Sequence, residues 1–255
     1  MTIKGINIEL TNYCDKQCWI CHKTKYGIKN APMNMNFKIL QKLAEELYPG
    51  TIVYFHYYGE PLLYPRLKDA IELFENQITT IVTNGKLIIK KFDEIVPSLD
   101  SLCISVFEGD PEQEEQFRLI GEFLERKKRR KPNTIIKLIG DVDPGKYMKF
   151  SNFALLTRRT LFEKKFAKKN ALPLITDYGV CSDFLHKPLV NINGDVSICC
   201  VFDTQKIGVI GNLNDRSLRE IWNTEKRNKW LKYHMTGNRE KVPLCENCNF
   251  WGITS

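Results

Sequence analysis

The chain has 255 residues, of which 43% are hydrophobic and 27% charged, so it can build a hydrophobic core without disulfides and is neither disordered nor fibrous. Its mean hydropathy is −0.32 and no run of about 18 apolar residues occurs, which excludes a membrane-spanning protein. The formal net charge is +8, which leaves an acidic partner open.

Strand and helix signals alternate through the first 150 residues. The first strand signal lacks the apolar run and cleavage site of a signal peptide, so we expect a cytoplasmic protein. The alternation indicates βα units around a parallel sheet. Five or six such units are too few for an eight-fold barrel, so we predict a partial, open barrel. The predicted strands are 3–10, 51–58, 79–83, 101–107 and 134–139, and the predicted helices are 37–48, 67–74, 88–95 and 112–129.

Much of the excess positive charge lies at the end of the last of these helices, in the run RKKRRK at residues 126–131. We interpret it as a solvated helix end, where cations are favourable. A patch for nucleic acid is the alternative, but the run lacks the interleaved aromatic residues of a single-strand groove, so we expect no nucleic-acid partner.

The pattern changes after about residue 150. We expect one more strand at 151–157, a basic and helix-like link at 158–170, and a hairpin that turns at Asn193-Gly194. A helix near 216–235 and a final CENC loop follow. We therefore predict two domains, a partial barrel over residues 1–165 and a small α+β domain over residues 166–255.

Nine cysteines are present, three of them near the N-terminus and five after residue 180. An odd count without a secretion signal argues against a disulfide framework and favours metal binding. The first three, Cys14, Cys18 and Cys21, form C-x3-C-x2-C after the first strand. Three thiolates can hold a four-iron cluster and leave its fourth iron open. A structural zinc with His22 as the fourth ligand is the alternative.

The segment TNYCDKQCWIC, followed in order by Tyr58-Gly59-Glu60-Pro61, Thr83-Asn84-Gly85 and Ser105, resembles the radical S-adenosylmethionine (radical SAM) superfamily. The resemblance implies a partial (β/α)6 barrel, a four-iron cluster on the three cysteines, and S-adenosylmethionine (AdoMet). It also implies an electron donor such as flavodoxin or ferredoxin. The implied AdoMet contacts are backbone groups of Ile20 for adenine, Tyr58, Gly59 and Glu60 for the amino group, and Asn84 and Ser105 for ribose and carboxylate.

A second cysteine set comprises Cys181, Cys199, Cys245 and Cys248. Four cysteines ligate either a four-iron cluster or zinc, and their spacing does not separate the two. The C-terminal part resembles the SPASM/twitch extension of radical SAM enzymes in three segments, LVNINGDVSICC, GVIGNLNDRSLREIWN and CENC. This resemblance implies an auxiliary four-iron cluster on the four cysteines. Because no further cysteine follows Cys248, we expect the twitch form with one auxiliary cluster.

FHYYGEPLL at 55–63 and the KVPLCENCN ending resemble the dehydrogenases among twitch enzymes. That resemblance implies two-electron oxidation of a hydroxylated, sugar- or cyclitol-like small molecule, with the auxiliary cluster as electron acceptor and Arg159 as a substrate contact. Arg159 in a solvated basic link is the alternative. Cys200 suggests an alternative reaction. If this cysteine returned a hydrogen atom to the substrate radical, the protein would be an epimerase or another redox-neutral enzyme. Peptide or nucleotide modification also stays open, as does a zinc-stabilised nucleic-acid-binding module, which leaves residues 58–61 unexplained.

Overall fold

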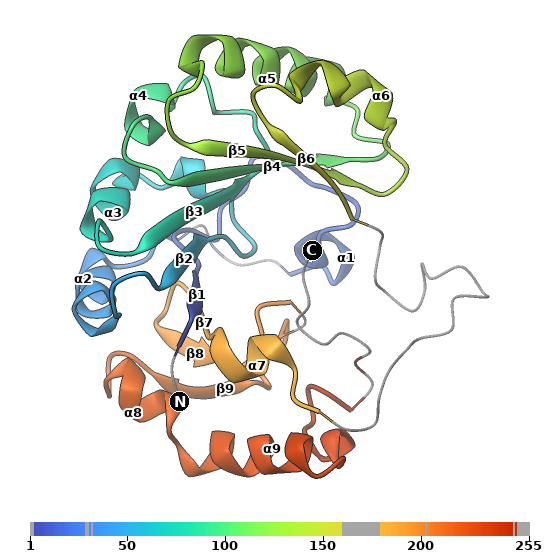
Figure 1. Cartoon of the computed structure of the whole chain (residues 1–255). Helices are drawn as coiled ribbons and strands as arrows, with labels where there is room; N and C mark the ends of the chain where they lie inside the picture. The colour runs from blue at the N-terminus through green and yellow to red at the C-terminus, as the bar shows by residue number, and fades with distance from the viewer. Residues whose placement is uncertain are drawn as a thin grey trace.

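A curved, nine-stranded sheet is the centre of the molecule (Figure 1). The computed structural model describes residues 3–28, 31, 33–159, 179–201, 203–246 and 248. Within these residues the strand order is β6-β5-β4-β3-β2-β1-β7-β8-β9. Six parallel strands form the barrel part: β1 (Gly5–Ile8), β2 (Ile52–Phe55), β3 (Ile78–Thr83), β4 (Ser101–Phe107), β5 (Asn133–Ile139) and β6 (Leu155–Arg159). The predicted partial barrel is confirmed.

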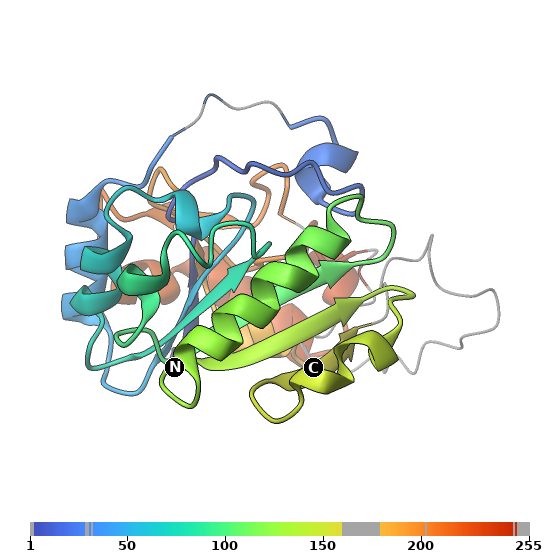
Figure 2. The ribbon, with the colours of Figure 1, turned by 90° about the horizontal axis from the view of Figure 1, so that it is seen from above.

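Helices cover the convex side of this sheet, as Figures 1 and 2 show. They are α2 (Phe37–Glu46), α3 (Leu67–Leu73), α4 (Phe92–Ile95), α5 (Gln113–Lys127) and α6 (Pro144–Tyr147), with short 3-10 turns at Pro61–Leu63 and Met148–Phe150. The short helix α1 (His22–Lys25) lies instead over the space that the sheet encloses. The convex side is therefore closed by helices, whereas the concave side holds the loop that leads into α1.

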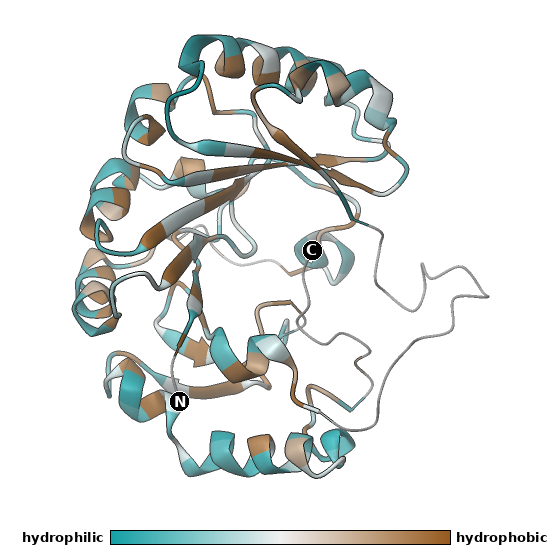
Figure 3. Cartoon of the chain, in the orientation of Figure 1, coloured by the Kyte–Doolittle hydropathy of each residue, from teal (hydrophilic) through white to brown (hydrophobic). Residues whose placement is uncertain are grey.

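The alternation of side chains along each strand separates an apolar layer from a polar one. Ile6 and Ile8 of β1 are fully buried in the main hydrophobic core, and Phe55 of β2 packs edge-to-face on Phe74 at 5.7 Å between ring centroids. Asn7, between the two isoleucines, points the other way and bonds His56. In Figure 3 the apolar colour follows the strands and the helix faces turned toward them. The core thus lies between sheet and helices, and polar groups face the inside of the barrel.

The C-terminal part continues the same sheet. Strand β7 (Leu189–Val190) pairs parallel with β1 and antiparallel with β8 (Asp195–Ser197), which pairs with β9 (Val209–Asn212). The predicted hairpin turn is confirmed, since Gly194 has φ +84°, a conformation that glycine adopts readily. Four short elements complete this part: α7 (Ser182–His186), α8 (Leu218–Trp222), α9 (Glu225–Met235) and a 3-10 turn at Arg239–Lys241.

Several predicted boundaries are wrong. The strand expected at 151–157 lies at Leu155–Arg159, because Leu155 to Arg159 pair residue by residue with Ile135 to Ile139 of β5. Residues 158 and 159 therefore end a strand and do not begin a helical link, whose residues 160–178 lie outside the described part.

The C-terminal helix and the loop before it also differ from expectation. The helix expected at 216–235 is broken at Asn223-Thr224, which end α8 and begin α9. A capping box of Ser217 and Glu220 begins the first half, α8. Strand β9 occupies what was expected to be a loop. None of the helices described is both long and apolar enough to span a lipid bilayer.

Candidate active site

A cavity of about 400 Å³ lies inside the barrel, beside the loops that follow β1, β2 and β3. This cavity is lined by residues that are far apart in the sequence. We predicted them separately as cofactor, cluster and substrate residues. They are Cys14, Cys18, Ile20, Cys21, Tyr58, Gly59, Glu60, Asn84, Ser105, Arg159 and Cys200. The fold therefore brings the N-terminal cysteine motif, the predicted AdoMet residues and both predicted substrate residues together.

The loop that carries Cys14, Cys18 and Cys21 is held by its neighbours. The amide of Cys21 donates to the carbonyl of Cys18 at 3.0 Å, which closes a turn directly before α1. Lys16, with 4% of its side chain exposed, pairs with Asp110 after β4 at 2.6 Å. Burial raises the pKa of the Cys14 thiol, and raises that of Cys18 to about 11. A buried thiol in this loop is thus protonated unless a positive group binds it.

The turn Tyr58–Pro61 packs directly on the cysteine loop. The amide of Glu60 donates to the carbonyl of Tyr13 at 2.8 Å. A Cβ atom on Gly59 would lie 1.9 Å from the carbonyl oxygen of Thr11, which is closer than any non-bonded contact allows. Glycine at position 59 is therefore required for the two loops to meet, and the backbone at this position borders the cavity without a side chain.

The carboxyl group of Glu60 joins the ends of β2 and β3. It is 2% exposed, and it accepts hydrogen bonds from the Leu62 amide at 3.1 Å, the Thr83 hydroxyl at 2.8 Å and the Asn84 amide at 2.8 Å. Burial raises the pKa of Glu60 to about 7, and the donated hydrogen bonds oppose that rise. Glu60 thus has a structural role that sequence analysis missed, in addition to bordering the predicted AdoMet site.

Asn84 directly follows β3, Ser105 lies within the neighbouring strand β4, and the two share one partner. The side-chain amide of Gln116, from α5, donates to the carbonyls of Asn84 at 2.7 Å and Ser105 at 2.9 Å. The side-chain amide of Asn84 donates to the carboxylate of Asp15 at 2.8 Å, and this hydrogen bond links Asn84 to the cysteine loop. Gln116 therefore positions both predicted AdoMet contacts from the convex side of the sheet.

The first cysteine set suits a cluster better than a single ion. Within the described ranges, no three His, Cys, Asp or Glu side chains are gathered tightly enough to bind one metal ion. A single Zn²⁺ needs every sulfur about 2.3 Å from the metal. A four-iron cluster is larger, and its ligands stand further apart. Three thiols around one side of a cavity that also borders the Gly59 turn are compatible with an iron–sulfur cluster.

The second cysteine set lies around α7 and the C-terminal turn. Cys181 caps α7, and the amide of Cys248 donates to the carbonyl of Cys245 at 3.2 Å. Burial raises the pKa of Cys245 to about 12; the nearby Cys248 and Cys181 add to the rise, and a hydrogen bond from Arg239 opposes it. The fourth predicted ligand, Cys199, follows β8 and accepts from the Val201 amide at 3.4 Å. The thiols of Cys181, Cys245 and Cys248 are therefore close to one another. Cys199 directly precedes Cys200, which lines the cavity.

Arg159 and Cys200 both face the cavity. Arg159 ends strand β6, is half-buried and lines the cavity, so it does not lie in a solvated link, and burial lowers its pKa. Cys200 is buried, with its sulfur 3.6 Å from a carboxylate oxygen of Asp183. That carboxylate pairs with Lys187, another lining residue, at 2.7 Å. A buried thiol and cationic groups therefore occupy the same side of the cavity.

His56, Lys137 and Lys187 also line the cavity and were not predicted as site residues. Nε2 of His56 is 3.0 Å from the side-chain amide of Asn7. Burial, with Lys187, Lys137 and Arg159 nearby, lowers the pKa of His56 to about 3, so its ring is neutral at pH 7. The alternation of inner and outer residues along β5 was the sequence signal that could have identified Lys137.

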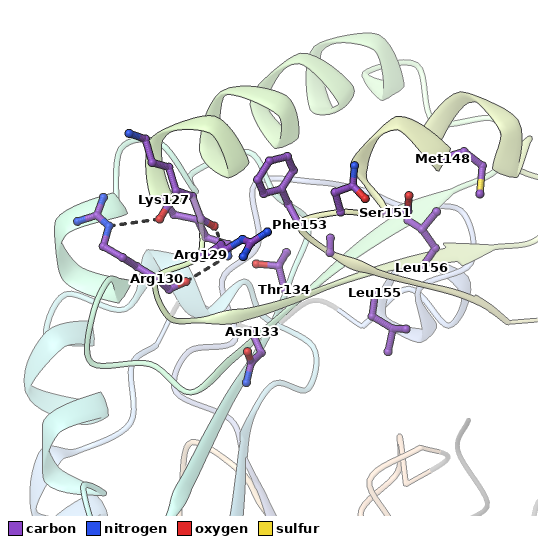
Figure 4. A pocket seen from close by; sticks show the side chains of 13 residues that line it. Lys127, Arg129, Arg130, Asn133, Thr134, Met148, Ser151, Phe153, Leu155 and Leu156 are labelled. Carbon is purple, nitrogen blue, oxygen red and sulfur yellow. Dashed lines mark hydrogen bonds between the residues drawn. The ribbon is translucent and has the colours of Figure 1, made fainter.

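The basic run and a second hollow lie elsewhere, at the opposite ends of β5 and β6 (Figure 4). This hollow of about 600 Å³ is bordered by the end of α5 and residues 148–156. Arg126 pairs with Asp93 at 3.2 Å, Lys131 pairs with Asp100 at 2.5 Å, and Arg130 donates to the carbonyls of Lys127 and Arg126. Much of the basic run is therefore used within the molecule, as expected for a helix end.

Comparisons with known proteins agree with this geometry. Residues 8–140, more than half of the chain, match the model of the radical SAM superfamily. The chain belongs to the radical SAM superfamily. Residues 181–249 of this radical SAM enzyme also match the SPASM iron-sulfur cluster-binding domain. Iron–sulfur binding and AdoMet binding follow from these two matches, and the enzyme class agrees with the sequence prediction.

Similar proteins extend over the whole radical SAM chain. It is 25% identical over 255 residues to the S-adenosyl-L-methionine-dependent 2-deoxy-scyllo-inosamine dehydrogenase of Niallia circulans, covering 96% of this chain and 92% of that protein. The structure of BtrN in complex with AdoMet and 2-DOIA matches with a TM-score of 0.65 at 18% identity, covering 98% and 94% of the two chains. BtrN in an open conformation matches with a TM-score of 0.59 at 20% identity, covering 98% and 93%. The two structural matches support the fold.

Proposed function

We propose that this radical SAM enzyme oxidises a hydroxyl-bearing carbon of a sugar- or cyclitol-like small molecule by two electrons. The observation that carries the proposal is the single cavity that joins the Cys14–Cys21 loop to Arg159 and Cys200, next to Cys199 of the second cysteine set. The similarity to the dehydrogenase of Niallia circulans supports the same reaction type. We also propose a division near residue 165 into barrel and twitch domains.

Two four-iron clusters are proposed, one on Cys14, Cys18 and Cys21 and one on Cys181, Cys199, Cys245 and Cys248. When bound, the first cluster and AdoMet supply a 5′-deoxyadenosyl radical, and the auxiliary cluster supplies an acceptor for the second electron of the oxidation. The electron for AdoMet cleavage comes from a donor of the flavodoxin or ferredoxin type. The oxidation would remove one hydrogen atom from carbon, one proton from the hydroxyl and one further electron, and the auxiliary cluster on Cys181, Cys199, Cys245 and Cys248 would be the acceptor of that electron.

The chain's own residues bind and orient the reactants. AdoMet binds beside the cysteine loop. It is held by backbone groups of Ile20, Tyr58 and Gly59 and by Glu60, Asn84 and Ser105. Arg159 places a cation at the substrate, and a cation beside a hydroxyl favours loss of its proton. Because Arg159 is partly withdrawn from water, its charge acts more strongly than that of a surface arginine.

Iron analysis and product mass test the proposal together. Anaerobically reconstituted wild type should hold about eight irons per chain, and a Cys181→Ala/Cys199→Ala variant about four. Cys103→Ala, in the core of β4 and outside both sets, is the matched control and should keep the wild-type iron content. The product should be two hydrogens lighter than the substrate. About four irons and one zinc in wild type would remove the electron acceptor and contradict the proposal.

A second candidate is a redox-neutral epimerase, favoured by the buried Cys200 thiol that lines the cavity. There, the Cys200 thiol gives a hydrogen atom to the substrate radical, and an external electron donor and a proton restore the thiol. Cys200→Ala separates the candidates: an epimerase stops turning over, whereas a dehydrogenase continues. Turnover in D2O gives a second readout, since an epimerase product gains one deuterium at the inverted carbon from the exchanged thiol, whereas the oxidised carbon of a dehydrogenase product carries no hydrogen or deuterium.

A further inference from the structure

A series of hydrogen bonds joins the cavity to Cys199 of the second cysteine set. The hydroxyl of Tyr57, a residue that lines the cavity, donates to the backbone carbonyl of Asp203 at 3.0 Å. The carboxylate of Asp203 accepts from the hydroxyl of Ser197 at 2.5 Å. The oxygen of that hydroxyl in turn accepts from the backbone amide of Cys199 at 3.3 Å. We name the three residues Tyr57, Ser197 and Asp203 the Tyr57 network.

The hydrogen bonds of this network are shielded from bulk water. Ser197 is 3% exposed and Asp203 is 5% exposed. Burial raises the pKa of Tyr57 above its usual range, so the phenol keeps its proton and acts as a donor. A hydrogen bond from a hydroxyl to a carboxylate is stronger than one between neutral groups, and a buried partner that is left without it is costly. These bonds therefore fix the loop after β8 firmly.

Gly208, which directly precedes β9, packs the network against the C-terminal cysteines. Its amide donates to the other carboxylate oxygen of Asp203 at 3.1 Å. A Cβ atom on Gly208 would lie 2.8 Å from the hydroxyl oxygen of Ser197 and 2.8 Å from the side chain of Leu244. Leu244 directly precedes Cys245. The loop that carries Cys245 therefore meets the network across Gly208, where no side chain fits.

The other end of the network is anchored in the barrel. The ring of Tyr57 stacks on the ring of Tyr58 with 3.8 Å between the centroids, and both residues line the cavity. Tyr58 begins the turn that contacts the first cysteine loop through Gly59. The network thus extends from the turn proposed to hold AdoMet to one of the proposed ligands of the auxiliary cluster.

We propose that the Tyr57 network positions Cys199, so that the auxiliary cluster is held at a fixed place beside the cavity. The proposal rests on the proposed function, because it needs a cluster on the second cysteine set. Tyr57, Ser197 and Asp203 are positioning residues, since they act on the cluster through Cys199. Residues that hydrogen-bond a metal ligand orient it, and an electron acceptor has to stay at a defined distance from the radical that it oxidises.

Two variants break the network at different points, and a third is the matched control. Tyr57→Phe removes the first hydrogen bond and keeps the ring, whereas Ser197→Ala removes the two hydrogen bonds that follow. Tyr64→Phe removes a bond of the same kind elsewhere, because the buried Tyr64 hydroxyl donates to the backbone carbonyl of Met35 at 3.0 Å. All proteins are reconstituted anaerobically and compared with wild type.

Two measurements follow the auxiliary cluster without any substrate. The rate at which a chelator removes its iron shows how firmly the cluster is held. Pulsed electron paramagnetic resonance on the fully reduced protein gives the distribution of distances between the two clusters, which shows where it is held. The cluster on Cys14, Cys18 and Cys21, recognised by the change in its spectrum when AdoMet is added, is the internal control for a folded barrel.

We expect Ser197→Ala to lose auxiliary-cluster iron at least about tenfold faster than wild type. Tyr57→Phe should broaden the distribution of distances between the clusters, because the loop after β8 is no longer tied to the barrel. Tyr64→Phe should match wild type in both measurements, although it unfolds more easily. The first cluster should behave alike in all four proteins.

Two results would overturn the proposal. If Tyr57→Phe and Ser197→Ala both match Tyr64→Phe in iron loss and in the distance between clusters, the network serves the fold alone. If the wild type holds only about four irons, the auxiliary cluster is absent and the proposed function fails as well. The iron content of the wild type therefore distinguishes the two failures. Should Ser197→Ala not fold, the distances in Tyr57→Phe decide.

Discussion

The carbonyl oxygen of Thr11 lies 1.9 Å from the point that a Cβ atom on Gly59 would occupy. This contact joins the loop after β1, which carries the cysteine motif, to the turn after β2, which carries Glu60. The amide of Glu60 adds a hydrogen bond to Tyr13 in the same loop. The loop proposed to hold the cluster and the turn proposed to hold AdoMet are therefore packed as one structural unit, so we expect a change in one to displace the other.

Gly59→Ala should separate these loops. The new methyl group meets rigid backbone, so we expect a loss of stability of about 1–3 kcal/mol and AdoMet binding weakened at least about tenfold. Gly121→Ala, within α5, is the matched control. A Cβ atom on Gly121 would lie 3.5 Å from the ring of Phe150, which is an ordinary van der Waals contact. That control should gain about 0.5–1 kcal/mol. Urea unfolding measures the stability of the two variants, and AdoMet titration measures their affinity for AdoMet. Wild-type AdoMet affinity in Gly59→Ala would contradict the close contact.

Glu60→Gln should weaken both the fold and AdoMet binding. The amide nitrogen of glutamine would face one of the three donors that now bond the carboxylate, at a cost of about 1–3 kcal/mol. Thr79→Val is the control, since it removes a hydrogen bond to Asp100 at the other end of β3. Both variants should unfold more easily, but AdoMet binding should fall in Glu60→Gln alone. Equal AdoMet affinity in the two variants would leave Glu60 with a structural role only.

Glu9, just after β1, should make stability depend on pH. It is 4% exposed, and burial raises its pKa to about 7 from 4.5. The folded chain therefore binds more protons at this site than the unfolded chain between about pH 4.5 and 7, and this contribution to stability falls as pH rises through that window.

Glu9→Gln removes that contribution. Relative to wild type, the variant should gain about 1 kcal/mol between pH 6 and pH 8, because the ionised carboxylate is the unfavourable form. Glu60, whose pKa is also raised, keeps its own slope in both proteins, so the difference between them isolates Glu9. Anaerobic urea unfolding at pH 6, 7 and 8 measures it, and a constant difference would show that Glu9 stays ionised in the folded chain.

The sequence predicted the barrel because its strands are apolar and its helices amphipathic. Ser101–Phe107 and Asn133–Ile139 match the predicted strands almost residue by residue, since each combines β-branched residues with a clear boundary. Pattern alone could not show that β7 pairs with β1. That pairing joins residues about 180 positions apart, which periodicity cannot encode.

The site was predictable where chemistry depends on residue type and order. The cysteine motif and Tyr58–Pro61 carry a recognisable order along the chain, and all of their predicted site residues line the cavity. Lys137 was missed because a lysine in a strand has no distinctive neighbours in sequence. Its place in the cavity depends on the register of β5 with its neighbouring strands, which the local sequence does not show. Arg159 was placed in a link because the segment that follows it, residues 160–170, is rich in lysine.

Arg239 should tune the auxiliary cluster. Arg239 is 8% exposed, and its guanidinium hydrogen-bonds the thiol of Cys245 and opposes the rise in pKa that burial gives that thiol. A cation beside a cluster ligand stabilises the form with one more electron, so Arg239→Met should lower the reduction potential of the auxiliary cluster and slow substrate oxidation. Arg239→Lys, which keeps the charge, should restore most of the potential. An anaerobic redox titration followed by electron paramagnetic resonance measures it, with the cluster on Cys14, Cys18 and Cys21 as the internal control. If both clusters shift equally, or neither does, Arg239 serves packing around α9 and does not set the potential of the electron acceptor.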